Sequence, residues 1–380
     1  MKQKVYVMMS GGVDSSVAAL LLSQNPNCTL KGVFMKCWSL EKLREKGFTD
    51  DLYACNWEED LIDAKMVCQI LNIDFEVWDF QDEYADNVID YMINEYSLGR
   101  TPNPDVMCNS VVKFGVFYKK AMEEGADFVA TGHYAKIIDD NGKFLIGKAE
   151  DSIKDQSYFL WKIPEQCLAH TLFPIGIIIN KADVRELAVK YDLLTAKKKD
   201  SQGLCFVGKS SLNQMLIQRL GIKKGNIVTK DIVHSAGSKK ITKSIQAKYD
   251  QLGEVVLGAH DGAFLYTIGQ RNKLGIAGGP WYVSKVDIKD NTVEVVHHDN
   301  LNSIEQLTFF ADGINTFGEV GDGNFQCIVR YNQEPINCKL EFLDNKIKVD
   351  LQKPTIIAAG QSLVVYNGDK LVLGGIISYK

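Results

Sequence analysis

Residues 10–16 read Ser-Gly-Gly-Val-Asp-Ser-Ser, and this short stretch decides the fold of the first part of the chain. One apolar run, Val5–Met9, leads into it, and a second, Val17–Leu22, leaves it as a helix. A strand that turns through glycines into a helix directs free backbone N–H groups and the positive end of the helix dipole at a phosphate. Gly11 and Gly12 let the backbone turn sharply and approach a ligand, because neither has a Cβ. The stretch therefore predicts a phosphate-binding loop.

The polar side chains of this loop support the same prediction. Ser10, Ser15 and Ser16 supply hydroxyl donors, and Asp14 can orient a metal ion or cap the helix. No G-x-x-x-x-G-K-[ST] motif follows, which excludes the lysine-bearing loop of the NTPases that cleave between the β- and γ-phosphates. The string resembles the PP-loop of ATP pyrophosphatases, which bind the pyrophosphate of ATP and attach AMP to a substrate oxygen. That resemblance implies that the chain activates a substrate with ATP; the alternative is a serine- and glycine-rich turn without a ligand.

Length and composition describe an ordinary globular protein. The chain has 380 residues, of which 46% are hydrophobic and 24% charged, and this size predicts two or three domains. Nine cysteines without C-x-x-C spacing disfavour a disulfide framework or a structural zinc site. Their odd number, with no signal peptide or spanning helix in the sequence, predicts a cytoplasmic protein. The net charge of −5 does not indicate nucleic-acid binding, although an acidic protein can carry a local basic surface.

Strand and helix patterns alternate over the first two hundred residues. Strands are expected at 29–35, 74–80 and 127–133, and helices at 58–71, 84–96 and 111–123. This alternation predicts a parallel sheet, whose ligands bind at the carboxyl ends of the strands. The glycine loop and the segment Thr131–His133 both follow strands, so we expect one nucleotide site to be built from both.

The pattern changes after about residue 210. Turn residues separate alternating runs at 292–296, 326–331, 347–351 and 371–373, which predicts a small antiparallel β-barrel or sandwich. We therefore expect an α/β nucleotide-binding domain with a parallel sheet at 1–210, a small mixed central domain at 211–282 and an antiparallel β-barrel at 283–380.

Cys108 lies in a loop that two prolines, Pro102 and Pro104, are expected to hold stiff and non-helical. Asn109 can then cap the helix that is expected to begin two residues later. A thiol beside a helix N-terminus has its thiolate stabilised, and the thiolate is the nucleophile. Asp105 precedes the cysteine by three residues and is a candidate proton shuttle.

Cys205 is the second cysteine in a setting that favours reactivity. It follows the lysine run 197–199 and a glycine turn, which makes an electropositive surrounding for a sulfur. Cys68 and Cys327 lie inside periodic apolar patterns and are expected in the core. In a chain with an AMP-forming loop, we therefore expect Cys108 and Cys205 to work as a pair.

Several motifs together carry a closer resemblance. SGGVDSS, TPNPDVMCN, TGHYA, KDQSYFL, GLCFVG, YTIGQR and VRY occur in this order. Over essentially its whole length the chain resembles the tRNA-specific 2-thiouridylases, which place sulfur on C2 of the wobble uridine of certain tRNAs. The motifs TPNPDVMCN and GLCFVG are specific to that family among PP-loop proteins.

The resemblance implies a role for each motif. It implies that Cys205 carries a persulfide from a sulfur-relay system fed by a cysteine desulfurase, and that Cys108 closes a Cys108–Cys205 disulfide as sulfur is released. It implies that the target base meets Asn103, Pro104 and Asp105. The implied ATP contacts are Met8, Met9, Ser10, Gly11, Gly12, Val13, Asp14, Ser15, Met35 and Gly132. The implied tRNA contacts are His133, Lys154, Asp155, Gln156, Arg330, Tyr331 and Gln361.

The implied chemistry requires these parts together. The C2 oxygen of uridine is a poor leaving group, and adenylation converts it into AMP, which is a good one. Mg²⁺ is expected to arrive with ATP, close to Asp14, to stabilise the departing pyrophosphate, without a fixed metal site in the protein. The attacking group is either the persulfide or released sulfide, and either requires two thiols. The base must also leave its stack, which is least costly in a single-stranded loop.

Two other classes of protein remain as alternatives. A PP-loop ligase acting on a small metabolite would need an ammonia source and has no use for the cysteine pair or the barrel. An RNA-binding protein with a vestigial nucleotide fold would tolerate the loss of Asp14, Cys108 or Cys205, and all three are present. The lysine-bearing stretch 229–252 is longer than the resemblance leads us to expect, and we interpret it as a solvated loop rather than an RNA contact.

Overall fold

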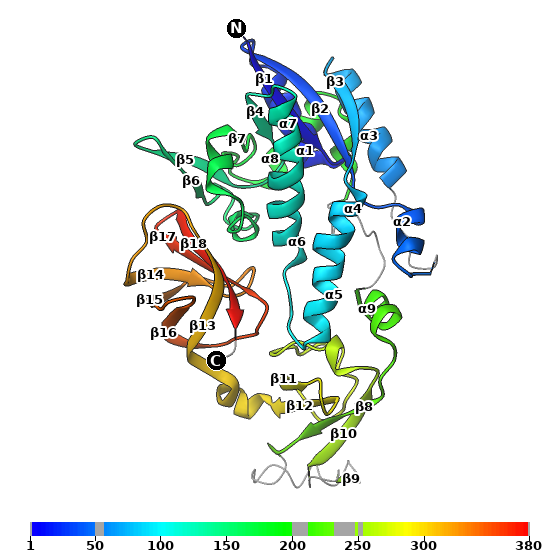
Figure 1. Ribbon diagram of the computed structural model, residues 1–380, viewed down its shortest axis with the longest axis vertical. Helices are drawn as coiled ribbons and strands as arrows, with labels where there is room; N and C mark the ends of the chain where they lie inside the picture. Colours follow the sequence, from blue (N-terminus) through cyan, green and yellow to red (C-terminus); the bar gives the residue numbers. More distant parts are fainter. Residues whose placement is uncertain (1, 50–56, 200–211, 232–247, 250–253, 379–380) are drawn as a thin grey trace.

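A computed structural model describes residues 2–49, 57–199, 212–231, 248–249 and 254–378. The chain forms an α/β part, a small central sheet and a β-barrel, and these lie beside one another in Figure 1. Among the described residues, no helix is both long enough and apolar enough to cross a bilayer.

The α/β part is built on a five-stranded sheet in the order β3-β2-β1-β4-β7, with every neighbouring pair parallel. This confirms the predicted parallel sheet. The strands are β1 Gln3–Met9, β2 Cys28–Lys36, β3 Asp74–Asp79, β4 Phe128–Ala130 and β7 Thr171–Leu172.

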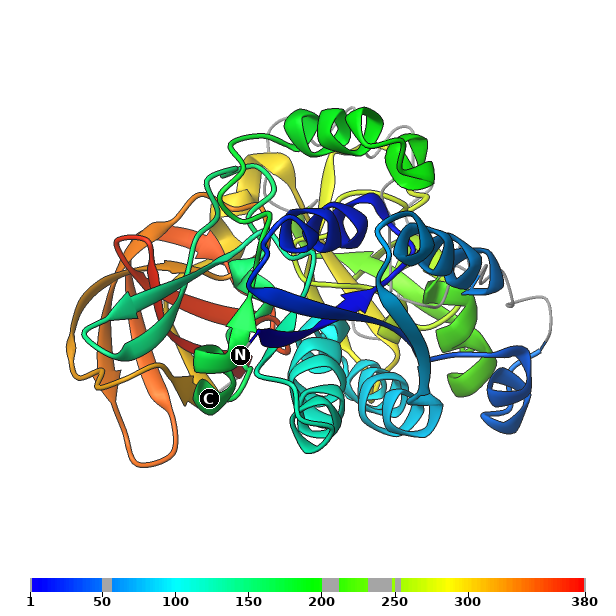
Figure 2. The ribbon, with the colours of Figure 1, turned by 90° about the horizontal axis from the view of Figure 1, so that it is seen from above.

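Helices cover both faces of this sheet, as Figure 2 shows. Alternate residues of β1 point to opposite faces, so Val5 and Val7 join one apolar core while Tyr6 and Met8 join another. The first core is closed by α1 Val13–Ser23, α3 Trp57–Ile70 and α8 Lys181–Lys190, and the second by the helices between residues 81 and 123. Smaller helices are α2 Leu40–Glu45, α9 Leu212–Leu220, η4 Ser157–Phe159, η5 Glu165–His170 and η6 Leu194–Lys197.

Two long helical runs cover the second face of the sheet. The second of these runs begins several residues before the expected start at residue 111. The first consists of α4 Gln81–Tyr84, the π-helical turn η2 Ala85–Ile89 and α5 Asp90–Ser97. The second consists of α6 Pro104–Met107, the π-helical segment η3 Cys108–Phe117 and α7 Tyr118–Glu123. The expectation of a non-helical segment up to residue 110 was therefore wrong. Pro104 starts the helix instead, because a proline at the first helical position loses no hydrogen bond and its φ already suits a helix.

The central sheet has the order β11-β12-β8-β10-β9. Its strands are β8 Gly225–Thr229, β9 Lys248–Tyr249, β10 Val255–His260, β11 Trp281–Asp287 and β12 Thr292–His297, with the short helix η8 Ala263–Leu265. The run 292–296 was expected in the barrel, and that was wrong: β12 pairs in parallel with β8. Val283 and Val293 pack with Ile227 in one buried cluster, so the hairpin completes the central core. The expected boundary between 282 and 283 thus falls inside β11.

Six antiparallel strands close the barrel in the order β13-β16-β15-β14-β17-β18, with β18 pairing back to β13. The predicted antiparallel barrel is thereby confirmed. It follows the helix η9 His298–Ile304, and its strands are β13 Glu305–Thr316, β14 Gly323–Ile328, β15 Ile336–Phe342, β16 Ile347–Ile356, β17 Ser362–Asn367 and β18 Lys370–Ser378.

The barrel is joined to the α/β part by strand pairing and by close packing. A hairpin of β5 Lys136–Asp140 and β6 Lys143–Gly147 extends the barrel sheet through β18. Asn315 of β13 donates from Nδ2 to the carbonyl oxygens of Trp161 at 2.8 Å and Ile163 at 3.1 Å. Gly374 lies against the Trp161 ring, where a Cβ would come within 2.4 Å of the indole.

The packing at Gly374 predicts a matched stability test. Gly374→Ala should lower the free energy of unfolding by about 1–3 kcal/mol, because an added methyl group overpacks the contact with the buried Trp161 ring. Gly321→Ala is the control, since a Cβ there meets no atom within 4 Å. Thermal unfolding followed by tryptophan fluorescence measures both variants, and equal midpoints would contradict the packing argument.

Candidate active site

The glycine loop lies at the carboxyl end of β1, as predicted. Gly11 has a φ of +71°, and a Cβ there would lie 2.2 Å from the carbonyl oxygen of Asp60, so only glycine fits. Gly12 is the N-cap residue of α1. The hydroxyls of Ser15 and Ser16, expected as donors to a ligand, donate to the Gly12 carbonyl at 3.0 and 2.8 Å. These two side chains therefore stabilise the turn through the Gly12 carbonyl.

The turn after β4 packs directly against this loop. A Cβ at Gly132 would lie 2.6 Å from the backbone carbonyl carbon of Asp14 and from the backbone nitrogen of Ser15. The turns after β1 and β4 therefore lie side by side; that they build one nucleotide site stays a prediction. Met8, Met9 and Met35, all expected to contact ATP, have side chains buried in the cores on the two faces of the sheet. Through those side chains they support the loop from within the core.

Lys181 is a residue of this site that the sequence reasoning missed. Its Nζ lies 2.6 Å from Asp14 Oδ1 and 2.7 Å from Asp14 Oδ2. The hydroxyl of Tyr134 donates to the same Oδ1 at 3.0 Å. No local pattern marks Lys181, which is the first residue of α8 and meets the loop only through the fold.

The segment expected to meet the target base is connected to the barrel. Asn103, the N-cap residue of α6, donates from Nδ2 to the hydroxyl of Tyr158 at 3.1 Å and to Oγ of Ser362 at 2.9 Å. Trp161 Nε1 donates to the same Ser362 Oγ at 2.9 Å. Asn103 is thus held by the α/β part and by β17 together, with Pro104 and Asp105 following it into α6.

Cys108 lies inside the helical run and is 1% exposed. Burial raises the pKa of its thiol to about 11; the positive charge of Lys113 opposes this shift and the negative charge of Asp105 adds to it. In a π-helix, residues five apart share a face, which explains why Lys113 acts on this thiol. The expected stabilisation of the thiolate by a helix N-terminus was wrong, because the helix starts at Pro104 and the thiol is buried.

Asn109 does not cap a helix as expected. It lies within the same helical run and donates from Nδ2 to the carbonyl oxygen of Phe159 at 3.0 Å.

His133 connects the glycine loop with the helix of Cys108. Its Nδ1 is 2.7 Å from Oγ1 of Thr131, and its Nε2 is 3.4 Å from Nζ of Lys113. Burial and the adjacent Lys113 charge hold the pKa of His133 well below its ordinary value, so the imidazole is neutral. Because His133 directly follows Gly132, the turn packed on the glycine loop also contacts the helical run that carries Cys108.

The segment 154–156 packs against the strand-end turn. The Asp155 carboxylate accepts hydrogen bonds from Ala149 N at 2.9 Å and from Ser157 N and Oγ at 3.3 and 2.7 Å. Gln156 accepts from Tyr134 N at 2.9 Å through Oε1. These two expected tRNA contacts therefore make internal hydrogen bonds, and the half-buried Lys154 precedes them in the chain.

Three expected tRNA contacts come from the barrel. Arg330 is exposed in the bend after β14, rather than on a strand as expected. The Tyr331 ring lies 4.4 Å from the ring of Phe159. Gln361 donates from Nε2 to the carbonyl oxygen of Thr101 at 2.8 Å. Gln361 thus bonds to the chain two residues before Asn103, Tyr331 packs on Phe159, and Arg330 is exposed.

A small cavity beside this segment contains a lysine that the sequence did not mark. Lys162 lines it together with Asn103, Met107 and Ser362. Its Nζ lies 3.5 Å from Met107 Sδ, and burial lowers its pKa.

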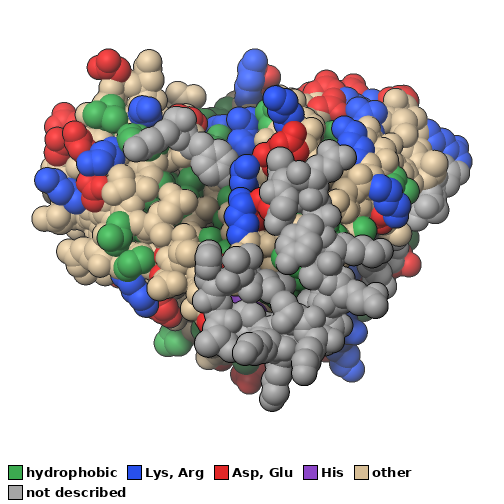
Figure 3. All heavy atoms as spheres, turned by 90° about the horizontal axis from the view of Figure 1, so that it is seen from below, with side chains coloured by type: hydrophobic (Ala, Val, Ile, Leu, Met, Phe, Trp, Pro, Cys, Tyr) green, Lys and Arg blue, Asp and Glu red, His purple; other side chains and the backbone are tan. Residues whose placement is uncertain are grey.

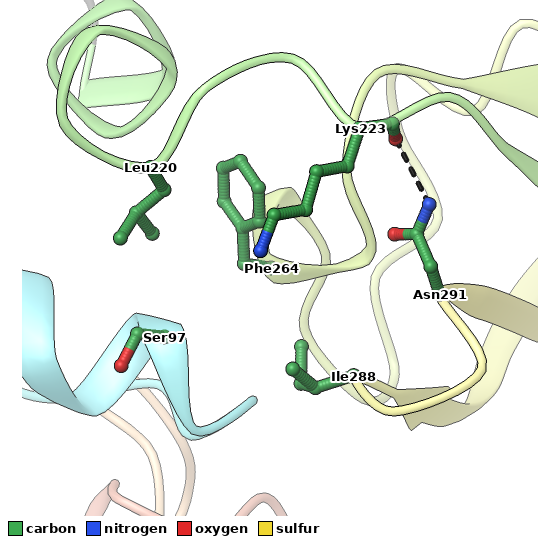
Figure 4. Close-up of a pocket in the computed structure, with 6 residues that line it drawn as sticks. All are labelled: Ser97, Leu220, Lys223, Phe264, Ile288 and Asn291. Carbon is green, nitrogen blue, oxygen red and sulfur yellow. Dashed lines mark hydrogen bonds between the residues drawn. The ribbon is translucent and has the colours of Figure 1, made fainter.

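A second cavity, shown in Figure 4, lies between α5, α9 and the central sheet. It is lined by Ser97, Leu220, Lys223, Phe264, Ile288 and Asn291. None of these is an expected site residue, so the cavity is separate from the candidate site.

Cys205 and the stretch 232–247 lie outside the described residues, so the Cys108–Cys205 pairing remains a prediction. The last described residues before this gap include Lys198, which lies beside the glycine loop. Lys198 Nζ is 2.6 Å from Asp60 Oδ1 and 2.5 Å from Asp63 Oδ2, and Asp60 is the residue packed on Gly11. The described cysteines are free thiols, namely Cys28, Cys37, Cys68, Cys108, Cys167, Cys327 and Cys338. The expected core residues Cys68 and Cys327 are indeed buried.

The fold and the site together define a class: a PP-loop nucleotide-binding domain with a buried cysteine, joined to a central sheet and a β-barrel. Family models match all three parts. Residues 3–209 match the tRNA methyl transferase HUP domain, 213–297 the tRNA methyl transferase PRC-barrel domain, and 303–377 the aminomethyltransferase beta-barrel domain.

Full-length relatives identify the family. The tRNA-specific 2-thiouridylase MnmA of Nitrosomonas europaea is 40% identical over 99% of this chain and 98% of its own length. The protein of the same name from Proteus mirabilis is 39% identical over 99% of this chain and 97% of its length. The chain belongs to the tRNA-specific 2-thiouridylase family. The U34-tRNA thiolase NcsA of Methanococcus maripaludis covers 65% of this chain and 74% of its own at 18% identity and a TM-score of 0.34, a likeness too low to bear on function.

The environment of Cys108 predicts slow alkylation in the native protein. With a pKa of about 11, about a thousandth of the thiol is ionised at pH 8, against about a quarter for a free thiol. We expect native Cys108 to react with iodoacetamide at least tenfold more slowly than in urea, even though a more basic thiolate is the better nucleophile. Because the pKa is raised, the rate should climb with pH up to about 11.

Mass spectrometry of the peptide containing Cys108 measures this rate, with the half-buried Cys28 as an internal control. Equal native and unfolded rates for Cys108 would show that the thiol is neither buried nor protonated.

Proposed function

We propose that this protein places sulfur on C2 of the wobble uridine of tRNA, using ATP to activate the C2 oxygen. The contact between Lys113 and His133 is the observation that supports the proposal most. His133 follows the turn packed on the glycine loop, and Lys113 lies near enough to Cys108 to act on its pKa. The full-length relatives named tRNA-specific 2-thiouridylase support it.

The first step is adenylation of the base. The C2 oxygen attacks the α-phosphorus of ATP, a C2–O–AMP bond forms, and the bond to pyrophosphate breaks. The backbone N–H groups at the start of α1 are positioned to stabilise the departing pyrophosphate. Mg²⁺ arrives with ATP and would be held between its phosphates and Asp14; among the described residues, no group of three or more His, Cys, Asp or Glu could hold a metal by itself.

The second step delivers sulfur and expels AMP. A persulfide on Cys205, loaded by a sulfur-relay protein fed by a cysteine desulfurase, supplies the sulfur. Either its outer sulfur attacks C2 before Cys108 attacks Cys205, or Cys108 attacks first and releases sulfide that attacks C2. Both routes place sulfur at C2, expel AMP and leave a Cys108–Cys205 disulfide, which an external thiol reductant must reduce before the next cycle.

Cys108 must lose a proton before it can attack. Its raised pKa keeps it protonated at neutral pH in the resting site. Asp105 lies close enough to influence that pKa and is the proposed proton acceptor, while Lys113 would stabilise the thiolate that forms. This assignment makes the reaction depend on both charged neighbours of the thiol.

The RNA would bind across the face where the barrel meets the base segment. The net charge of −5 does not oppose RNA binding, because basic side chains can gather locally: Figure 3 shows a column of lysine and arginine side chains on the face seen from below. Arg330 and Lys154 are proposed phosphate contacts. Gln361, already bonded to Thr101, would hold the base segment in place. We place the reaction in the cytoplasm, where a thiol reductant is available.

Two other functions fit the observations less well. Methyl transfer, which two of the family descriptions name, has no use for a PP-loop beside a buried thiol. A PP-loop ligase for a small metabolite would not need a barrel bonded to Asn103 and Thr101. Mass spectrometry of tRNA nucleosides after incubation with ATP and a sulfur source distinguishes the three, since only thiolation adds sulfur to uridine.

The cysteine assignments predict a contrast among variants. Cys108→Ser and Cys205→Ser should each lower 2-thiouridine formation at least a hundredfold, because a hydroxyl can neither carry nor release sulfur. Cys68→Ser and Cys327→Ser should keep activity and lose only stability, since both are core residues. The same nucleoside assay measures all four, and thiolation in the Cys205 variant would remove the persulfide assignment.

The RNA contacts predict a salt dependence. Arg330→Ala and Lys154→Ala should each weaken tRNA binding and reduce the slope of log K against log salt by about 0.7–0.9. ATP affinity should stay unchanged, because neither residue contacts the glycine loop. Anisotropy titrations over a range of salt measure the slopes, with the 77% exposed Lys119 of α7 replaced by alanine as the control. An Arg330 variant with unchanged slope and affinity would exclude this residue from the RNA interface.

A further inference from the structure

The ion pair between Lys181 and Asp14 occupies the centre of the glycine loop. Both carboxylate oxygens of Asp14 lie within hydrogen-bonding distance of the ammonium, at 2.6 and 2.7 Å. The Lys181 side chain is 14% exposed and that of Asp14 31%. The pair is therefore partly shielded from water. In such a setting the attraction between opposite charges is stronger than at an open surface.

The backbone of Lys181 is held by hydrogen bonds, whereas its ammonium stands at the end of a flexible four-carbon stem. Asn180 caps α8, and the Lys181 N–H donates to Asp151 Oδ2 at 2.9 Å. The flexible stem of the side chain passes the Tyr134 ring, with Nζ 5.4 Å from the ring centre. A lysine anchored in this way can move its ammonium by a few ångströms without moving the helix.

Asp14 needs a different partner before and after a nucleotide binds. An unpaired carboxylate beside the polyphosphate site would repel the phosphates of ATP. Asp14 does not belong to any group of three or more possible metal ligands among the described residues, so a metal there would need the phosphates as further ligands. Without nucleotide the carboxylate is neutralised by Lys181; with MgATP the metal supplies the positive charge.

We propose that Lys181 is an exchangeable counter-ion: it holds Asp14 in the empty site and moves to a phosphate oxygen of ATP when Mg²⁺ takes the carboxylate. The inference rests on the proposed ATP-binding role of the loop and adds a further substrate-binding residue to it. It also explains how an acidic side chain can sit in a phosphate site without repelling the phosphates. The ion pair would then favour binding of ATP together with Mg²⁺ over binding of ATP alone.

The test is a double-mutant cycle in which ATP binding is measured by calorimetry with Mg²⁺ and with a chelator. Asp14→Asn should bind metal-free ATP at least threefold more tightly than the wild type, because it frees Lys181 and removes a negative charge. Adding Lys181→Met to Asp14→Asn should then weaken metal-free ATP binding at least tenfold. If Lys181 served only to neutralise Asp14, this second substitution would change nothing, and that result would overturn the proposal.

Control variants separate charge from structure. Lys31 forms an ion pair with Glu76 at 2.7 Å, the same distance as from Lys181 Nζ to Asp14 Oδ2, but it lies towards the amino end of β2. Lys31→Met should therefore leave the ATP affinity within twofold of the wild type. Lys181→Arg keeps the charge and should retain most of the MgATP affinity that Lys181→Met loses. If a methionine variant fails to fold, Lys181→Gln takes its place with the same expectation. A folded wild-type protein that binds ATP in neither condition would contradict the proposed function itself, and not the role of Lys181 alone.

Discussion

The arrangement of the site depends on the hydrogen bonds of one residue, Thr101. Its N–H donates to the carbonyl oxygen of Ala359 at 2.9 Å, and its own carbonyl accepts from Gln361 at 2.8 Å. Its hydroxyl lies 2.9 Å from that of Thr267 in the central part. A backbone removed from water must find partners, and here the partners come from the other two parts of the chain. Because α6 begins three residues later, the same bonds set the position of the helix that carries Cys108.

The resting site keeps its reactive groups inactive by pairing or burial. Asp14 is neutralised by Lys181, and Lys198 is shared between Asp60 and Asp63 beside the glycine loop. Burial keeps the Cys108 thiol protonated, although Lys113 lies near enough to favour its thiolate. In the proposed reaction, substrate binding must therefore both exchange partners and promote loss of a proton. If Cys108 is the proposed nucleophile, its burial would protect the sulfur from oxidation and alkylation until the substrates bind.

Much of the fold could be predicted because the determining patterns are local. The apolar run before Ser10, the two glycines and the helical run after them specify a strand, a turn and a helix within twenty residues. The start of the helix at Pro104 could not be recognised in the same way, since a proline is compatible both with a stiff loop and with the first helical position. The β11–β12 hairpin was assigned to the barrel because alternation marks a strand but does not name the sheet it joins.

The sequence by itself determined the glycine loop, the parallel sheet, the barrel and the two cysteines worth testing, because each rests on residue types at short spacing. Only the tertiary structure decided the state and the partners of these groups. It buried Cys108 and raised the pKa of its thiol, placed Lys181 on Asp14 across 167 residues, and tied Gln361 to Thr101 across 260. Burial and ion pairing depend on what surrounds a side chain in space. Residues that meet across so many positions in the chain produce no local sequence pattern that could reveal the contact.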